Sequence, residues 1–315
     1  MGREQCDHMT EKNKTAGKAG CMLCPRNCGV RREAGEAGIC GQTSTVKVAR
    51  AALHYWEEPC ISGTAGSGTV FFSGCSLHCV FCQNHSIADG KAGKQVTTER
   101  LSEIFLELQE KGANNINLVT PGHFVPQIAE ALVRAKKQGM VLPVVYNTSS
   151  YEYVDTLRRM EGLADIYLPD FKYMSAALGL RYSHAEDYSK VAKAAIAEMV
   201  RQTGEAVFEN GDEDGLLRRG TIVRHLVLPG CTEDSKAVIR YFHERYGDMI
   251  YISIMNQFTP MPELTDYPEI NRKVTPEEYE EVVDYAISLG VERGFIQEGE
   301  TAEESFIPAF DGEGV

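Results

Sequence analysis

The chain has 315 residues, of which 43% are hydrophobic and 24% are charged, as expected for a globular protein with a sizeable core. The formal net charge of −13 argues against nucleic acid as a partner, because phosphate binding requires a basic face. Ten cysteines are present, which a chain of this length does not need as disulfides. Residues 1–20 lack an apolar signal segment, and no run of about 18 apolar residues could cross a membrane. We therefore expect a cytoplasmic protein with reduced thiols that serve metal binding or catalysis.

The cysteines divide the chain into segments. One group has the spacing C-x2-C-x3-C-x11-C and the other has the spacing C-x3-C-x2-C. The first group is Cys21, Cys24, Cys28 and Cys40, the second is Cys75, Cys79 and Cys82, and the isolated cysteines are Cys6, Cys60 and Cys231. This distribution predicts a flexible polar tail at 1–20, a cysteine-rich N-terminal segment at 21–68, a core at 69–260, and a C-terminal helix and cap at 261–315.

The core alternates between short apolar runs and helical patterns. The expected strands lie at residues 70–73, 116–119, 142–147, 165–168, 222–228 and 250–255, and residues 204–220 indicate a hairpin or surface loop. Helical stripes run through residues 101–108, 125–132, 192–200 and 279–286, and Thr275, Pro276 and Glu278 mark the start of the last helix. The alternation predicts an α/β fold with a parallel sheet covered by helices. Six units are too few for a full eight-stranded barrel, so a partial (β/α)6 barrel and an open doubly wound sheet both fit.

The C-x3-C-x2-C group follows the first of these strands, at the end where α/β folds bind their ligands. Three thiolates within eight residues can converge on one centre. Full ligation of a [4Fe–4S] cluster takes four cysteines, so three leave one iron open for another ligand. The alternatives are a zinc site, with His78 or His85 as the fourth ligand, and a group of packed thiols.

The spacing C-x3-C-x-aromatic-C after the first strand, with Phe81 as the aromatic residue, resembles the signature of radical S-adenosylmethionine (SAM) enzymes. The resemblance implies a partial (β/α)6 TIM barrel in which Cys75, Cys79 and Cys82 ligate three irons of a [4Fe–4S] cluster. It implies that the fourth iron binds SAM, and that an electron passed into the sulfonium releases a 5′-deoxyadenosyl radical, which abstracts a hydrogen atom. Phe81 is expected to lie against the adenine.

The same resemblance points to cofactor-binding residues at the ends of the other strands. After the second strand the family carries a Gly-Gly-Glu type segment, whereas this chain has T-P-G-H at 120–123, where Gly122 still allows close backbone approach. The D-F-K segment at 170–172 resembles the Asp-x-Lys segment of glycyl-radical-enzyme activators. The complete expected set is Phe81, Gln83, Gly122, Asp170, Lys172, Arg224, Asn256 and Gln257. On the fifth strand, Arg224 and Leu226 are expected to share a face opposite His225, and Arg224 or Lys172 can meet a carboxylate. For each single polar residue, an ordinary surface or barrel-layer role is the alternative.

Over nearly its whole length the chain resembles pyruvate formate-lyase-activating enzymes, in the branch with an N-terminal cysteine block. The stretches that carry this resemblance include CMLCPRNCG, GCSLHCVFCQN, IYLPDFKY and SIMNQFTPM. It implies a glycyl radical enzyme as protein substrate and reduced flavodoxin or ferredoxin as electron donor, with no nucleic acid or membrane partner. The alternatives are radical SAM modification of another small molecule or macromolecule, and a non-catalytic iron–sulfur or zinc protein.

The N-terminal group offers four thiolates with turns between them. Four thiolates suit tetrahedral zinc or a fully ligated [4Fe–4S] cluster, so Cys21, Cys24, Cys28 and Cys40 are expected to bind a second metal. The alternative is a group of reduced thiols, some of them packed.

Overall fold

The computed structural model describes residues 20–211, 215–261, 264–297 and 308–315. The predicted tail at 1–20 lies outside the described residues except for Gly20, and so does the centre of the predicted loop at 204–220.

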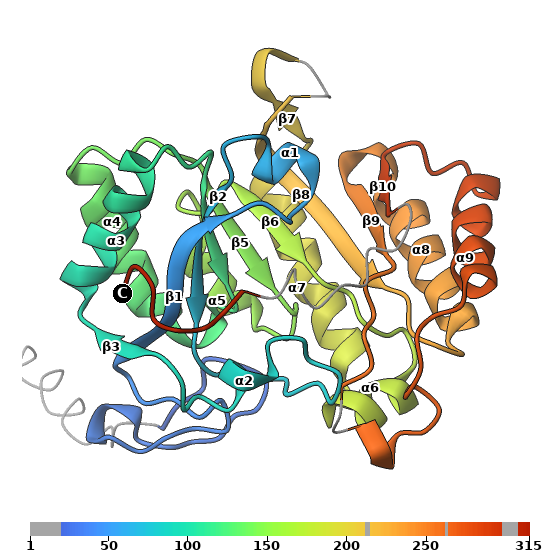
Figure 1. Cartoon of the computed structure of the whole chain (residues 1–315), viewed down its shortest axis with the longest axis horizontal. Coiled ribbons are helices and arrows are strands. Elements are labelled where there is room, and N and C mark those ends of the chain that lie inside the picture. Colours follow the sequence, from blue (N-terminus) through green and yellow to red (C-terminus); the bar gives the residue numbers. More distant parts are fainter. Residues whose placement is uncertain (1–19, 212–214, 262–263, 298–307) are drawn as a thin grey trace, which may run out of the picture.

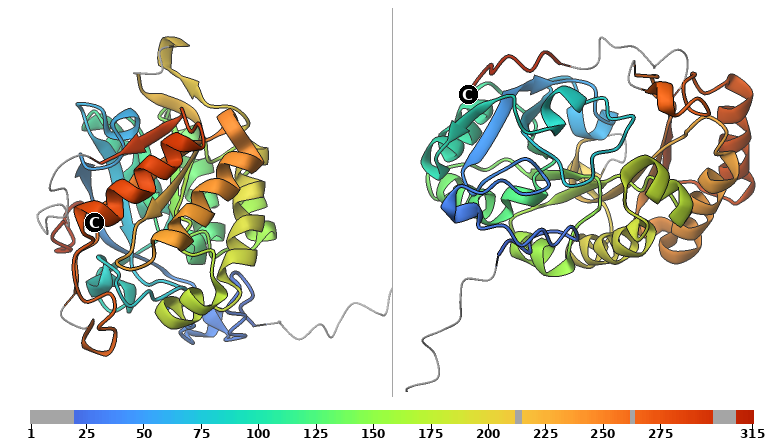
Figure 2. Two further views of the ribbon diagram at one scale, coloured as in Figure 1. Left: turned by 90° about the vertical axis from the view of Figure 1, so that its right-hand side faces the viewer. Right: turned by 90° about the horizontal axis from the view of Figure 1, so that it is seen from below.

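Six parallel strands form the body of the molecule, and they correspond to the six predicted apolar runs (Figure 1). They are β2 (Ser67–Phe72), β4 (Ile116–Val119), β5 (Val144–Thr148), β6 (Ile166–Pro169), β8 (Leu217–Leu226) and β9 (Tyr251–Met255). A seventh strand, β10 (Gly294–Ile296), pairs in parallel with β9. Seen from below, the strands curve into an open arc with helices along its outer side (Figure 2). The prediction of a parallel α/β fold is confirmed, and the arrangement is that of a partial barrel.

The helices cover the outer side of this arc. Those along the arc are α3 (Thr98–Glu110), α4 (Val125–Lys137), α5 (Val154–Leu157), α7 (Tyr188–Thr203), α8 (Thr232–Tyr246) and α9 (Pro276–Ser288). The short α1 (Pro59–Ser62) lies at the amino ends of the strands, and α2 (His85–Ala88) and α6 (Ala176–Ser183) lie at their carboxyl ends. The predicted stripe of α3 is buried, and α9 begins with the predicted capping box, in which Thr275 and Glu278 bond each other's backbone N–H. No residue range was predicted for α8, whose buried face is formed by Val238, Ile239 and Phe242.

The N-terminal segment contributes a strand to the sheet, and this strand was not predicted from the sequence. Strand β1 (Val46–His54) pairs antiparallel with β2 and with the short β3 (Lys94–Val96). The expected boundary at residue 68 therefore crosses a continuous sheet. An alanine-rich strand gives a weak apolar signal, since V-K-V-A-R-A-A-L-H has few β-branched side chains. The end of the chain also packs here: Gly312 N–H donates to Ala49 O and Ala51 N–H donates to Glu313 O.

Two smaller features match their predictions. The described part of residues 204–220 forms a hairpin in which β7 (Val207–Phe208) pairs antiparallel with β8. Cys60 is buried in α1 within an apolar cluster at the amino ends of the strands, as expected for a small packed thiol.

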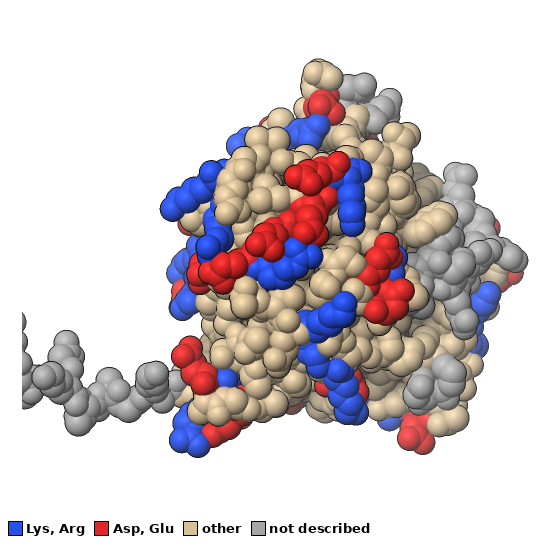
Figure 3. Space-filling model, turned by 60° about the vertical axis from the view of Figure 1, so that its left-hand side comes forward, with Lys and Arg blue, Asp and Glu red and all other residues tan. Residues whose placement is uncertain are grey.

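Charges on the face that includes α3 are mixed, with acidic and basic side chains side by side (Figure 3). Arg100 pairs with Glu103 and Glu107, and Arg134 pairs with Glu99 on the neighbouring helix. Among the described residues, no helix is both long and apolar enough to span a lipid bilayer.

Candidate active site

The loop after β2 carries the three cysteines of the second group into one cavity. Cys75, Cys79 and Cys82 all line this cavity, whose volume is about 210 Å³, at the carboxyl ends of the parallel strands. Gly74 begins the loop with a positive φ of 88°, and a Cβ at this position would lie 2.3 Å from the carbonyl oxygen of Cys40. The loop can follow its path only because residue 74 has no side chain.

The three thiols line one cavity, as the cysteine ligands of a single cluster must. Within the described residues, no three His, Cys, Asp or Glu side chains are gathered closely enough to hold one metal ion. A four-iron cube spreads its cysteine ligands more widely than one zinc does, and three sulfurs facing one cavity match that need. Burial raises the pKa of Cys82 to about 12 and also raises the pKa of Cys79. Such thiols ionise when a metal binds them.

Neither histidine of the zinc alternative faces the cavity. His78 lies in the left-handed region with a φ of 54°, and its Nε2 is 2.9 Å from the carbonyl oxygen of Ile39. His85 is exposed at the start of α2. Neither His78 nor His85 is therefore placed to act as the fourth ligand of a zinc ion bound by the three cysteines.

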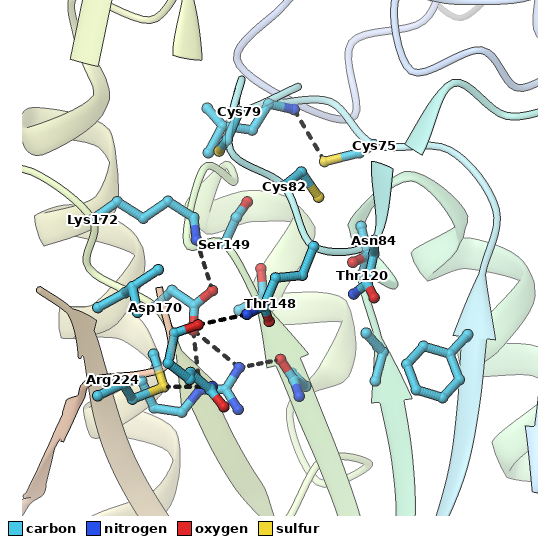
Figure 4. Close-up of a pocket in the computed structure, with 18 of the residues that line it drawn as sticks. Cys75, Cys79, Cys82, Asn84, Thr120, Thr148, Ser149, Asp170, Lys172 and Arg224 are labelled. Carbon is cyan, nitrogen blue, oxygen red and sulfur yellow. Dashed lines mark hydrogen bonds and ion pairs between the residues drawn. The ribbon is translucent and has the colours of Figure 1, made fainter. Parts of the chain in front are cut away.

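A charged network lies across the cavity from the cysteines (Figure 4). Lys172 Nζ is 3.0 Å from Asp170 Oδ2, and Arg224 is 3.0 Å from Asp170 Oδ1. Burial alone would raise the pKa of Asp170, but the charges of Lys172 and Arg224 outweigh it and lower the pKa below its usual value. For Lys172 the balance is the reverse, because burial lowers its pKa but Asp170 raises it further. Both side chains are therefore charged at neutral pH.

Glu57 completes this network and was not among the residues predicted from sequence. It lies between β1 and α1, and its Oε2 is 2.9 Å from Arg224 Nη1. Its other oxygen accepts hydrogen bonds from Asn117 Nδ2 at 2.8 Å and Asn147 Nδ2 at 3.2 Å. In this group of four side chains, two carboxyl groups therefore face two cationic groups. Nothing in the sequence around Glu57 signals this role, because the contact depends on how β1 folds onto β2.

Three more predicted residues, Phe81, Gln83 and Gln257, line the cavity. Phe81 does so while only 4% exposed, because it packs against Phe258 and Tyr173 with ring centroids 5.8 Å and 6.3 Å away. Gln83 donates from Nε2 to the backbone oxygen of Gln257 at 2.7 Å, which joins the cysteine loop to the end of β9. The predicted alternation of β8 is confirmed, since Arg224 and Leu226 line the cavity while His225 bonds Phe171 O and Ser235 Oγ outside it.

Two predicted residues do not line the cavity. Gly122 packs on the buried carboxylate of Glu152, where a Cβ would lie 2.8 Å from the carboxyl carbon. Asn256 donates its backbone N–H to Gln297 Oε1 at 2.7 Å. Both follow a strand end, as expected, but neither is among the residues that line the cavity. The cavity is lined at the end of β4 by Thr120 and at the end of β5 by Thr148 and Ser149, which the cofactor-binding prediction left out.

The N-terminal cysteines form a separate group that does not line the cavity. A Cβ on Gly38 would lie 3.1 Å from Cys28 Sγ and 3.6 Å from Cys40 Sγ, so these two sulfurs face the same glycine. Burial raises the pKa of Cys24 to about 11 and also raises the pKa of Cys40. All cysteines of the described residues are free thiols.

With the cavity and its cysteine loop defined, comparison with known proteins decides the family. Residues 69–242, more than half of the chain, match the model of the Radical SAM superfamily. The chain belongs to the Radical SAM superfamily. Members bind a [4Fe–4S] cluster and SAM, so the protein is a radical SAM enzyme. The matched region contains the whole cysteine loop and the Asp170–Lys172–Arg224 network.

Individual relatives of this radical SAM enzyme add little about its substrate. The uncharacterized protein MJ0674 of Methanocaldococcus jannaschii is 28% identical over 273 residues, which are 84% of this chain and 74% of that protein. Streptococcus suis SuiB bound to the precursor peptide SuiA is 13% identical, with a TM-score of 0.49, over 72% of this chain and 47% of SuiB. A domain of pyruvate-formate lyase-activating enzyme from Bacteroides vulgatus is 11% identical, with a TM-score of 0.40, over 55% of this chain and 91% of that domain. The chain thus spans about half the length of SuiB.

Proposed function

We propose that this radical SAM enzyme removes a hydrogen atom from the Cα of a glycine in a protein substrate, as glycyl-radical-enzyme activators do. The observation that supports this is the position of Asp170 and Lys172. These residues form the Asp-x-Lys segment that resembles the activators, and both line the cavity that holds the three cysteines. A reduced flavodoxin or ferredoxin would supply the electron.

The chain's own residues would bind and orient the cofactor. When bound, the cluster and SAM supply a one-electron cleavage of the sulfonium, which yields methionine and a radical that takes hydrogen from the substrate. Cys75, Cys79 and Cys82 would hold three irons. The Lys172 ammonium and the Asp170 carboxylate offer one charge of each sign, which complements the amino and carboxylate groups of a methionyl moiety. The ion pair with Arg224 holds Asp170 in place, and Phe81 gives the cavity an apolar wall.

The test is the origin of the transferred hydrogen. Anaerobically reconstituted protein is reduced with dithionite and incubated with SAM and with purified pyruvate formate-lyase labelled with deuterium at the glycine Cα positions. The proposal predicts deuterium in the 5′-deoxyadenosine and a glycyl radical signal in the electron paramagnetic resonance (EPR) spectrum of the labelled partner. The matched control is the Asp170→Asn variant, which should transfer far less deuterium.

The outcomes separate the alternatives. If 5′-deoxyadenosine forms without deuterium and without a glycyl radical, the glycine proposal is wrong for this partner, and a different small-molecule or macromolecular substrate is favoured. If SAM is not cleaved although the cluster is present and reduced, a non-catalytic iron–sulfur role is favoured.

We further propose that Cys21, Cys24, Cys28 and Cys40 hold a second metal, either zinc or a [4Fe–4S] cluster. The support is their number and the position of Cys28 and Cys40 against Gly38. Their sulfurs would have to turn toward one another, since as placed they do not form a single-ion site. Metal analysis of anaerobic protein, with and without substitution of all four by serine, tests this. Equal zinc and iron contents in both proteins would contradict it.

A further inference from the structure

Arg26 joins the N-terminal cysteine segment to the loop that carries the catalytic cysteines. It lies between Cys24 and Cys28, yet its guanidinium reaches residues far along the chain. Nε donates to the carbonyl oxygen of Ser76 at 2.7 Å, and Nη2 donates to that of Leu77 at 3.1 Å. Ser76 and Leu77 lie between Cys75 and Cys79, so Arg26 holds the backbone between two of the expected cluster ligands.

The same guanidinium also holds the end of α6. Nη2 donates to the carbonyl oxygen of Ser183 at 2.8 Å, and Nη1 donates to that of His184 at 2.6 Å. The last carbonyls of a helix have no partner within the helix, and a cationic donor there satisfies them. The guanidinium also stacks over the Tyr151 ring, 5.1 Å from its centroid. Arg26 thus bridges two backbone segments through four carbonyl groups.

The end of α6 touches a cluster ligand directly. Ser183 Oγ is 3.1 Å from Cys79 Sγ and donates a hydrogen bond to it, and Tyr173 OH is 2.9 Å from the same hydroxyl. Beside it, Val80 N–H donates to the carbonyl oxygen of Tyr182 at 2.9 Å. The segment that Arg26 holds from one side therefore contacts Cys79 from the other.

We infer that Arg26 is a positioning residue for the cluster: it fixes the cysteine loop against α6 so that the three thiols face one cavity and Ser183 reaches Cys79. The inference rests on the proposed function only in that the loop must hold a cluster. It gives the N-terminal cysteine segment a role at the active site that does not depend on whether that segment binds a metal.

The chemistry of the contact explains why arginine stands here. A guanidinium carries five N–H donors in one plane, and four carbonyls from two segments converge on Arg26. A lysine ammonium has three donors on one nitrogen, so it cannot bond all four carbonyls at once. Hydrogen bonds from a charged donor are stronger than those between neutral groups, so losing several should loosen the loop measurably.

The test is hydrogen–deuterium exchange on the full-length protein without its cluster, comparing wild type with Arg26→Gln, Arg26→Lys and Arg31→Gln. Arg31 is the matched control, because it lies in the same segment, is 72% exposed and pairs only with nearby Glu36 among the contacts described for its side chain. We expect exchange across residues 76–82 to be about tenfold faster in Arg26→Gln, intermediate in Arg26→Lys and unchanged in Arg31→Gln. Exchange in β4 and β5 should be unchanged in all of them.

A second readout follows the cluster itself. After reconstitution, Arg26→Gln should lose iron to a chelator faster than wild type, and Arg31→Gln should not. The inference is overturned if residues 76–82 of Arg26→Gln exchange at the wild-type rate. Should that variant fail to fold, wild-type exchange in Arg26→Lys overturns it equally. Because exchange is measured without cluster or SAM, a failure of SAM cleavage would count against the proposed function and not against this inference.

Discussion

Glu57 Oε2 lies 2.9 Å from Arg224 Nη1, and this ion pair joins a residue outside the matched family region to the middle of the active-site network. Both side chains are largely buried, with 10% and 12% of their surfaces exposed. Arg224 also contacts Asp170 and Asn147, so Glu57 fixes the residue that in turn fixes the Asp170–Lys172 pair. The N-terminal part of the chain therefore supports two parts of the active site. Glu57 contacts the Asp170–Lys172–Arg224 network, and Arg26 contacts the cysteine loop.

Replacing Glu57 by glutamine should destabilise the protein, because it removes one partner of a buried charge. Breaking a buried pair costs about 3–5 kcal/mol, and the remaining contact of Arg224 with Asp170 places the expected loss near the lower end. Urea unfolding of the cluster-free protein measures it. The matched control is Glu99→Gln, whose pair with Arg134 is exposed and should give no measurable change. Equal stabilities of the two variants would contradict the role of Glu57.

Replacing Asp170 by asparagine should weaken SAM binding, and it should also destabilise the protein, as Glu57→Gln should. The asparagine keeps the shape of the side chain but removes the charge that both Lys172 and Arg224 face. The loss of charged hydrogen bonds predicts a dissociation constant for SAM that rises about 10- to 100-fold. Equilibrium binding of SAM to the reconstituted protein checks this, with Asp155→Asn on the surface as the control. Unchanged affinity would show that the pair does not contact the cofactor.

Removing the Ser183 hydroxyl should lower the reduction potential of the cluster. Ser183 Oγ donates to Cys79 Sγ, and hydrogen bonds to the ligand sulfurs stabilise the reduced, more negative state. A redox titration of Ser183→Ala followed by EPR measures the shift. Ser189→Ala is the control, because Ser189 also bonds a sulfur but that of Met174, outside the ligand set. A potential equal to that of wild type would mean that the hydroxyl does not reach the cluster ligand.

Because His123 is buried, the protein should become less stable in mild acid. Burial lowers the pKa of this histidine to about 3 from an ordinary 6.5, with smaller contributions from Arg32 and His78. Its Nε2–H donates to Ser73 O at 2.8 Å, which opposes this shift, but burial outweighs the hydrogen bond and keeps the ring neutral in the folded state. Below pH 6.5 the unfolded chain binds a proton that the folded chain does not, so stability falls by about 1.4 kcal/mol per pH unit as the pH drops toward 3.

The measurement is urea unfolding of wild type and His123→Gln, without the cluster, between pH 7 and pH 4. Glutamine can still donate to Ser73 but does not titrate, so the variant should lose less stability over this range. Identical pH dependence in the two proteins would assign the acid sensitivity to other groups.

Sequence reasoning could place the strands and the cysteine loop because their signals are local. Apolar runs of four to seven residues matched six of the seven parallel strands among the described residues, and the spacing of Cys75, Cys79 and Cys82 marked the loop after β2. Asp170, Lys172 and Arg224 were also placed correctly at the cavity, since strand ends in a parallel sheet meet at one edge.

What could not be predicted depends on contacts between distant segments. Glu57 and Arg224 are 167 positions apart, and Arg26 and His184 are 158 positions apart. No periodicity or residue spacing in the sequence predicts either contact. The contact of Gly122 also depends on a distant residue: its missing Cβ makes room for the carboxylate of Glu152, whereas its expected approach to the cofactor stays a prediction.

The most direct test of the account is SAM cleavage by the three-cysteine site. Anaerobically reconstituted, dithionite-reduced protein should contain iron and sulfide and convert SAM to 5′-deoxyadenosine and methionine. Cys82→Ala should abolish the conversion, while Cys60→Ala, which changes a buried thiol in α1 away from the cavity, should retain it. Full cleavage activity in Cys82→Ala, or zinc without iron in the wild-type protein, would contradict the assignment of the cavity as a radical SAM active site.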